Sequence, residues 1–150
     1  MENIVYKLRP YEAFDYGFVY YIKKIVYRIY VEQNWGEWNE ESQKAMFEDF
    51  IKTYSKDIKI IMLNNQNIGF FHGNNTESGD YELGNICILP EFQGKGIGSQ
   101  ILKDIINNHK NQNIHLRFFK QNPVVNLYKR LGFEIVEELP YHYKMKLERK

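Results

Sequence analysis

The sequence has 150 residues, of which 43% are apolar and 26% charged, and its 20 Lys and Arg nearly balance its 19 Asp and Glu. This length predicts a single domain over residues 1–150, and the near-neutral charge argues against a nucleic-acid partner. No apolar run reaches the ~18–20 residues of a membrane span, no basic and apolar leader is evident, and Cys87 is the only cysteine, so we expect a cytoplasmic domain without a disulfide or a membrane partner.

Two amphipathic helices are predicted in the first third of the chain. Residues 4–9 form a predicted short strand that Pro10 closes, because proline disfavours helix at the residue before it. Apolar residues then recur every three or four positions, as on one buried helix face: Phe14, Phe18, Tyr21, Ile22, Ile25, Val26 and Ile29. After a predicted loop over residues 33–38, Asn39 is a suitable N-cap for a second helix, whose expected buried stripe is Met46, Phe47, Phe50, Ile51 and Tyr54.

From residue 58 the pattern changes to short β-branched and aromatic runs. An Asn-rich segment at 64–67 predicts a hairpin between strands at 58–63 and 68–72. The order of all predicted elements, β-α-α-β-β-β-α-β-α-β-β, indicates an α/β (α+β) fold with a mixed, mostly antiparallel sheet flanked by helices on both faces. The remaining elements are strands at 83–89, 114–119, 133–139 and 141–147 and helices at 97–110 and 124–131.

A glycine-rich segment joins the strand at 83–89 to the helix at 97–110. Glycines let a ligand approach the backbone, and the amides of a first helical turn attract anions, so this segment predicts a phosphate or pyrophosphate site. The alternative is a turn that only connects the two elements. The segment consists of Gln93, Gly94, Lys95, Gly96, Ile97, Gly98 and Ser99.

Spacing narrows the choice of phosphate ligand. A P-loop is excluded because no Gly-Lys-Ser or Gly-Lys-Thr tract is present. A dinucleotide fingerprint nearly fits, but it needs an acidic residue about 20 positions further on, where Ile114 and His115 stand. A nicotinamide-dependent enzyme is therefore disfavoured.

Two blocks of the sequence fit a different pattern. The first is Gln-x-x-Gly-x-Gly at residues 93–98, and the second is Asn-Pro-x-x-x-x-Tyr-x-x-x-Gly-Phe at residues 122–133. Together with the order of the elements, they resemble the GNAT superfamily of acetyl-CoA-dependent N-acetyltransferases. The resemblance implies acetyl-CoA as co-substrate, with its pyrophosphate on residues 93–99, its pantetheine along the backbone of Ile86 and Ile88, and Asn122 and Tyr128 nearby.

Three roles in acetyl transfer can be assigned on this basis. Glu82 stands eleven residues before Gln93, as the catalytic glutamate of the histone-acetyltransferase branch does, and we expect desolvation to raise its basicity. The resemblance implies that Tyr128 is the general acid for the leaving thiolate. The amide of Ile86 or Cys87 would stabilise the oxyanion. The alternatives are a solvated carboxylate at Glu82 and a core tyrosine at Tyr128.

Neither cysteine nor metal chemistry is expected. Cys87 lies within an apolar strand beside no group that would lower its pKa, so the sequence predicts inert packing. The four histidines, His72, His109, His115 and His142, have no metal-ligand spacing.

The acceptor wall is expected between the first two helices and in the last hairpin. Its predicted residues are aromatic or acidic, which suits an amine through cation–π contacts and charge pairing: Tyr27, Tyr30, Trp35, Glu37, Trp38 and His142. The alternative is that the tryptophans only pack the loop onto the core.

The expected function is transfer of an acetyl group from acetyl-CoA to a primary amine in a ternary complex. The alternative is a non-catalytic coenzyme A-binding sensor on the same fold. The acceptor stays open between a free amino compound, a polyamine, an aminoglycoside and a peptide N-terminus or lysine, and the protein is expected to be a monomer or homodimer.

Overall fold

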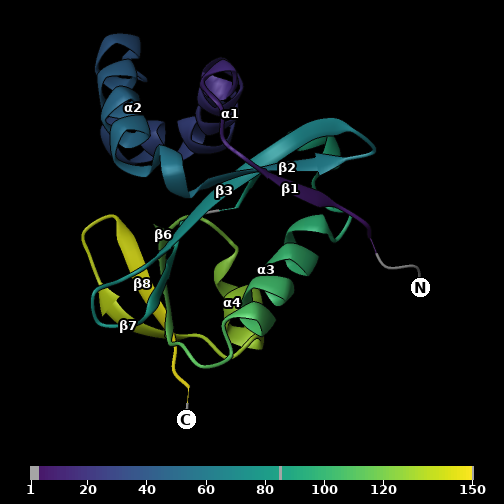
Figure 1. Ribbon diagram of the computed structural model, residues 1–150. Helices are drawn as coiled ribbons and strands as arrows, with labels where there is room; N and C mark the ends of the chain where they lie inside the picture. Colours follow the sequence, from purple (N-terminus) through teal and green to yellow (C-terminus); the bar gives the residue numbers. More distant parts are fainter. Residues whose placement is uncertain (1–3, 85, 150) are drawn as a thin grey trace.

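The computed structural model describes residues 4–84 and 86–149, and their strands form one sheet (Figure 1). The strand order is β1-β2-β3-β4-β6-β8-β7, with β5 paired to β3. Within the described part of the chain, β4 and β6 form the one parallel pair. The strands are β1 (Lys7–Pro10), β2 (Ile58–Leu63), β3 (Gln66–Asn75), β4 (Tyr81–Leu83), β5 (Cys87–Ile88), β6 (Ile114–Phe119), β7 (Glu134–Glu138) and β8 (His142–Leu147).

Helices cover both faces of this sheet, which confirms the predicted fold class. They are α1 (Tyr16–Trp35), α2 (Glu40–Tyr54), α3 (Ile97–Asn108) and α4 (Val125–Arg130). Figure 1 shows α1 and α2 on one side and α3 and α4 on the other. Two buried clusters match these layers: α1 and α2 pack on Ile58, Ile60 and Phe70, whereas α3 and α4 pack on Ile61, Ile68 and Phe71.

Local signals placed several boundaries correctly. Asn64 and Asn65 adopt φ values of 51° and 65°, as expected for a two-residue hairpin turn with left-handed positions. The Asn39 side chain accepts a hydrogen bond of 2.9 Å from the amide of Ser42 and so caps α2 as predicted. The predictions of 58–63 and 114–119 as strands are confirmed residue for residue.

The single strand predicted at 83–89 is wrong. The amide of Gly84 donates to the carbonyl of His72, and Cys87 pairs with Phe70. The chain therefore advances three residues, from 84 to 87, while β3 advances only two, from 72 to 70. The pairings on either side thus differ in register by one residue, as they do across a β-bulge. This shift separates β4 from β5.

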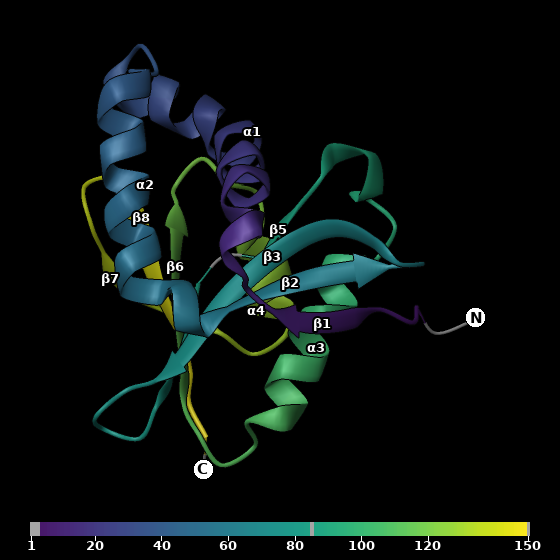
Figure 2. The same cartoon turned by 45° about the horizontal axis from the view of Figure 1, so that its top comes forward.

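Beyond β4 the sheet opens. β4 pairs with β6 only at Ile114 and His115, whereas β5 pairs with β3. The C-terminal part of β6 therefore pairs with β8 alone among the described strands. Figure 2 shows β6, β8 and β7 turned away from β1, β2 and β3. Ile86 lies at this opening.

Parts of the predicted helical core are also wrong. α1 continues to Trp35 through residues assigned to a loop, and β1 begins at Lys7 rather than at residue 4. The apolar side chains of α1 point in too many directions for one sheet face, so its buried residues are Val19, Ile22 and Val31. Other expected core residues are exposed: Phe14, Tyr21, Ile25, Ile29 and Met46.

No helix within the described ranges is long and apolar enough to cross a membrane.

Candidate functional site

The glycine-rich segment forms the N-terminal end of α3. Gly94 and Gly96 have φ values of 74° and 84°, in the left-handed region that favours glycine. Gly96 is the N-cap of α3 and supplies no side-chain cap. The first-turn amides therefore have no partner inside the helix, and they can hold an anion.

A cavity of about 300 Å³ lies beside this segment. It brings together eight of the eleven predicted coenzyme residues, together with Val26 of α1 and Phe92. The eight are Ile86, Ile88, Gln93, Gly94, Gly96, Ile97, Gly98 and Ser99.

The other three predicted coenzyme residues lie outside that lining. Lys95 is exposed, with its Nζ 5.8 Å from the centre of the Phe92 ring. The side-chain oxygen of Asn122 accepts a hydrogen bond of 3.0 Å from the amide of Val124. Tyr128 is buried in the core against Phe118 and Phe133. Gln93 does line the cavity. Its side-chain amide donates a hydrogen bond of 2.8 Å to the carbonyl of Ile88 and so links the glycine-rich segment to β5.

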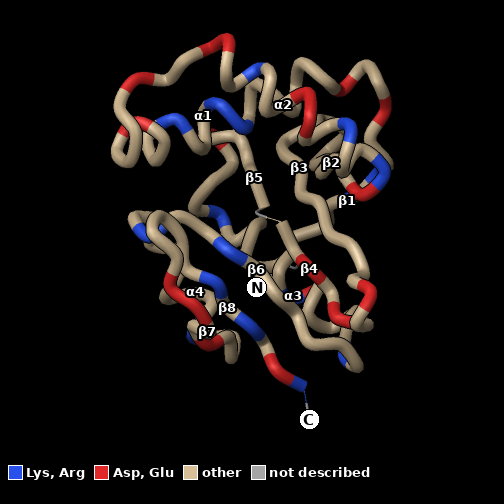
Figure 3. Tube along the Cα trace, turned by 90° about the vertical axis from the view of Figure 1, so that its left-hand side faces the viewer, with Lys and Arg blue, Asp and Glu red and all other residues tan. Residues whose placement is uncertain are grey.

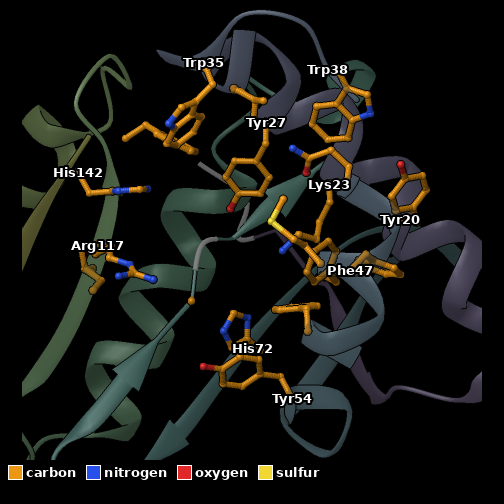
Figure 4. A pocket seen from close by; sticks show the side chains of 18 of the residues that line it. Tyr20, Lys23, Tyr27, Trp35, Trp38, Phe47, Tyr54, His72, Arg117 and His142 are labelled. Atoms are coloured by element: carbon orange, nitrogen blue, oxygen red, sulfur yellow. The ribbon is translucent and has the colours of Figure 1, made fainter. Parts of the chain in front are cut away.

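A second and larger cavity, of about 850 Å³, lies between α1, α2 and the open sheet (Figure 4). Five of the six predicted acceptor residues line it, and so does Glu82. The sixth, Tyr30, stacks on Phe119 with ring centres 5.5 Å apart and is outside the lining. The five are Tyr27, Trp35, Glu37, Trp38 and His142.

The tryptophan wall of this cavity is anchored. The Trp38 ring N–H donates to Glu40 at 3.2 Å, and the Tyr20 hydroxyl donates to the same carboxylate at 2.7 Å. Lys24 also binds Glu40, and these hydrogen bonds lower the pKa of Glu40 to about 2. Trp35 packs on Tyr141 with ring centres 4.6 Å apart.

Strand register explains why Glu82 faces the cavity. Glu82 pairs with Asn74 on one side and with His115 on the other, so these side chains share a face. Leu83 is buried on the opposite face. The expected desolvation of Glu82 is wrong, however, because this residue, although it lines the cavity, is exposed to solvent. Its position suits a base that exchanges protons with water.

The same register brings in polar residues that the sequence reasoning missed. His72 lies on the face of β3 that bears Asn74, and Arg117 lies two residues after His115 on β6. Side chains alternate between the two faces of a strand, but this alternation assigns His72 and Arg117 to the face of Glu82 only when the pairing of β4 with β3 and β6 is known. The missed lining residues with polar or charged groups include Lys23, Tyr54, His72, His115, Arg117 and Lys144.

Two of these groups are desolvated. Burial lowers the pKa of Lys23, whose Nζ lies 3.7 Å from the centre of the Phe50 ring. Burial and the nearby charge of Lys23 lower the pKa of His72 to about 4, so its imidazole is neutral at pH 7. Its Nδ1 is buried without a hydrogen-bond partner in the described residues.

Cys87 and Tyr128 are protonated at neutral pH. Burial raises the pKa of the Cys87 thiol to about 11, and its Sγ lies 3.5 Å from the hydroxyl oxygen of Tyr27. Burial also raises the pKa of Tyr128 to about 12. A thiol this weakly acidic is a poor nucleophile, in line with the packing role predicted for Cys87.

The two cavities approach each other where the sheet opens. Val26 lines the smaller cavity and Tyr27 the larger, although they are consecutive in α1. Ile86 lines the smaller cavity and Gly84 the larger, and both lie between the end of β4 and the start of β5. The two cavities are therefore lined by neighbouring residues of α1 and of the segment between β4 and β5.

The described residues contain no group of three or more His, Cys, Asp and Glu that could hold a metal ion.

Comparisons with known proteins agree with this arrangement. The family model of the acetyltransferase (GNAT) domain matches residues 55–135. A protein of Gracilaria tenuistipitata var. liui, named as the uncharacterized N-acetyltransferase ycf52, is 34% identical over 67 residues. That match covers 44% of this chain and 37% of the relative, so this chain spans well under two thirds of the relative's length.

Solved structures show the same fold. The PaiA N-acetyltransferase of Thermoplasma acidophilum in complex with coenzyme A has a TM-score of 0.70 and 16% identity, over 97% of this chain and 99% of the other. A structure described as histone acetyltransferase HPA2 and related acetyltransferase, from Corynebacterium glutamicum, has a TM-score of 0.76 and 15% identity, over 98% of each chain.

Proposed function

The chain belongs to the GNAT acetyltransferase family, and from this membership we propose that it transfers the acetyl group of acetyl-CoA to a primary amine by direct attack in a ternary complex. The observation that carries the proposal is the nearness of the two cavities, since Val26 and Ile86 line the smaller one and their neighbours Tyr27 and Gly84 line the larger. The smaller would hold the coenzyme and the larger the amine. A coenzyme A sensor would need no second cavity of about 850 Å³ lined by charged groups.

The smaller cavity fits the coenzyme's diphosphate. A Cβ on Gly94 would meet no atom within 4 Å, and one on Gly98 would meet only Ile88 at 3.5 Å, so the backbone there is open to a ligand. First-turn amides of α3 and the helix dipole favour the negative charge. When bound, acetyl-CoA supplies an activated thioester.

Residues of the chain supply the proton transfers in this proposal. An alkylamine with a pKa of about 10.4 is only about 0.04% neutral at pH 7, so loss of its proton limits attack. Glu82 would accept that proton and pass it to solvent. The amide of Ile86 would donate to the acetyl oxygen, and the Tyr128 phenol would donate toward the sulfur.

A thermal-shift experiment tests coenzyme binding. Acetyl-CoA at about 100 times its Kd adds roughly 2.7 kcal/mol, which corresponds to a Tm increase of about 5–10 °C for a domain of this size. Gly98→Glu places a carboxylate at the same amides and should abolish the shift. Asn107→Glu, which adds the same charge at the far end of α3, is the matched control and should keep it.

Thiol release from acetyl-CoA across a library of amines then tests transfer. We expect release with at least one amine class and a loss of roughly 10²-fold or more in kcat for Glu82→Gln. Absence of a Tm shift at millimolar acetyl-CoA would overturn coenzyme binding. A normal shift without transfer to any amine would favour the sensor.

A further inference from the structure

Resting on the proposed acetyl transfer, we infer that the acceptor is an amine that also carries a carboxylate, and that Arg117 binds this carboxylate. The larger cavity then recognises both ends of an amino acid or a similar small molecule.

Arg117 faces the cavity without a counter-charge. It lines the cavity from β6, on the strand face shared with His115 and Phe119. Within residues 4–84 and 86–149 no carboxylate forms an ion pair with its guanidinium, and its side chain is exposed. Figure 4 shows Arg117 and His142 on one wall, across from Tyr27 and Lys23.

The neighbouring strand adds to the positive field. Arg117 is the register partner of Lys144 on β8, and like charges directly opposite each other on adjacent strands destabilise a sheet. Lys144 has a partner, since its Nζ lies 3.7 Å from Glu137 on β7. Figure 3 shows this arrangement of basic positions on β6 and β8 beside acidic positions on β7. An anion bound to Arg117 would offset the remaining repulsion between Arg117 and Lys144.

The charges around the cavity disfavour a polycation. Three Lys or Arg side chains line it, Lys23, Arg117 and Lys144, against the two carboxylates of Glu37 and Glu82. A polyamine or an aminoglycoside would bring several positive charges against this wall. An acceptor with one amine and one carboxylate complements it.

The charges favour a carboxylate over a phosphate. A guanidinium binds either group through two parallel hydrogen bonds, but a single guanidinium balances the one charge of a carboxylate and only part of the charge of a phosphate dianion. Of the other two cations, Lys144 is shared with Glu137 and Lys23 is packed over Phe50. Arg117 is thus the one lining Lys or Arg, among those described, that combines exposure with the absence of an ion pair or a cation–π contact.

Strand register places Glu82 and Arg117 on the same face of the sheet. Glu82 pairs with His115, and Arg117 is the next residue of β6 on that face. Both residues line the larger cavity. The acceptor's amine would lie at Glu82, its carboxylate at Arg117 and its apolar body against Tyr27, Trp35 and Phe119, which also line the cavity.

Matched ligand pairs test the inference by binding. N-acetyl-L-phenylalanine and N-acetyl-2-phenylethylamine differ only by the carboxylate, as do N-acetyl-L-leucine and N-acetyl-3-methylbutylamine. Calorimetry on the protein saturated with coenzyme A should show at least tenfold tighter binding for the carboxylate member of at least one pair. Arg117→Gln should remove that advantage and change binding of the other member less than threefold.

Lys146→Gln is the control, because it removes a cation of the neighbouring strand β8 that does not line the cavity. It should leave the discrimination intact. The corresponding free amines provide a kinetic readout, where the amino acid should exceed its decarboxylated counterpart and spermidine in kcat/KM by at least tenfold.

Each outcome has a defined meaning. Equal binding within both pairs, a preference for spermidine, or equal losses for both members in Arg117→Gln would overturn the inference while leaving acetyl transfer standing. Arg117-dependent discrimination without turnover of any amine would uphold the carboxylate site and contradict the proposed transfer.

Discussion

The imidazole of His72 lies against the backbone of Gly84, so that a β-carbon on Gly84 would stand 2.0 Å from Cε1 and 2.3 Å from Nδ1 of that ring. The ring is also held between Phe50 and Tyr54, with ring centres 5.1 Å and 4.7 Å away. Gly84 directly follows β4, where the sheet opens. The absence of a side chain there lets His72 cover the start of the opening.

Gly84→Ala should therefore displace His72. Overpacking of this kind costs about 1–3 kcal/mol, and the moved ring should raise the KM for the amine. Gly17→Ala is the control, since a Cβ there meets nothing within 4 Å inside α1, and it should stabilise by about 0.5–1 kcal/mol. Urea unfolding measures both, and equal stabilities would contradict the prediction.

His72 should make stability depend on acid pH. Its pKa is about 4 in the folded protein, compared with 6.5 for an unperturbed histidine. Between these values the unfolded chain binds a proton that the folded chain excludes, so stability falls as the pH drops below about 6.5 and is unaffected above it. At pH 4.5 the cost is about 2.5 kcal/mol relative to pH 7.

His72→Gln isolates this contribution because its amide is neutral at both pH values. The difference in unfolding free energy between the natural protein and this variant should shrink by about 2.5 kcal/mol from pH 7 to pH 4.5. Urea unfolding at the two pH values measures it. Parallel pH curves for the two proteins would show that His72 does not titrate as described.

Local chemistry accounts for what the sequence predicted well. The hairpin at Asn64 and Asn65 depends on backbone preferences of the residues themselves, and the capping of α2 depends on the Asn39 side chain. The position of the glycine-rich segment at the N-terminus of α3 could likewise be predicted, because consecutive residues form this helix start.

Long-range pairing accounts for what the sequence missed. The apolar run at 83–89 does not reveal that its second part, β5, pairs with β3, whereas the C-terminal part of β6 pairs with β8. Without that register, neither His72 nor Arg117 could be assigned to the cavity. Exposure of Phe14 was equally hidden, because Phe14 lies in a separate 3-10 helix, Ala13–Asp15, that precedes α1, so the helical period predicted from the sequence does not apply to it.

Cys87 should play no chemical part in the reaction. With a pKa of about 11, only on the order of 0.1% of its thiol is ionised at pH 8. Iodoacetamide should therefore modify it far more slowly in the folded protein than in urea, and Cys87→Ala should keep kcat within severalfold. An acetyl group found on Cys87 by mass spectrometry would overturn direct transfer.

Two tyrosines compete for the role of proton donor to the thiolate, and paired variants separate them. Tyr128, with its pKa of about 12, stays protonated across the working pH range but is buried against Phe118 and Phe133. Tyr27 lines the larger cavity, and its hydroxyl oxygen lies 3.5 Å from the Cys87 Sγ, next to the opening. The family resemblance favours Tyr128, so Tyr128→Phe should lower kcat about 10²-fold with little change in the Kd of acetyl-CoA, measured by calorimetry. Tyr27→Phe should change kcat less than tenfold. The reverse pattern would assign the proton to Tyr27 and leave Tyr128 as a core residue, because a phenol that only packs loses stability on substitution and not turnover.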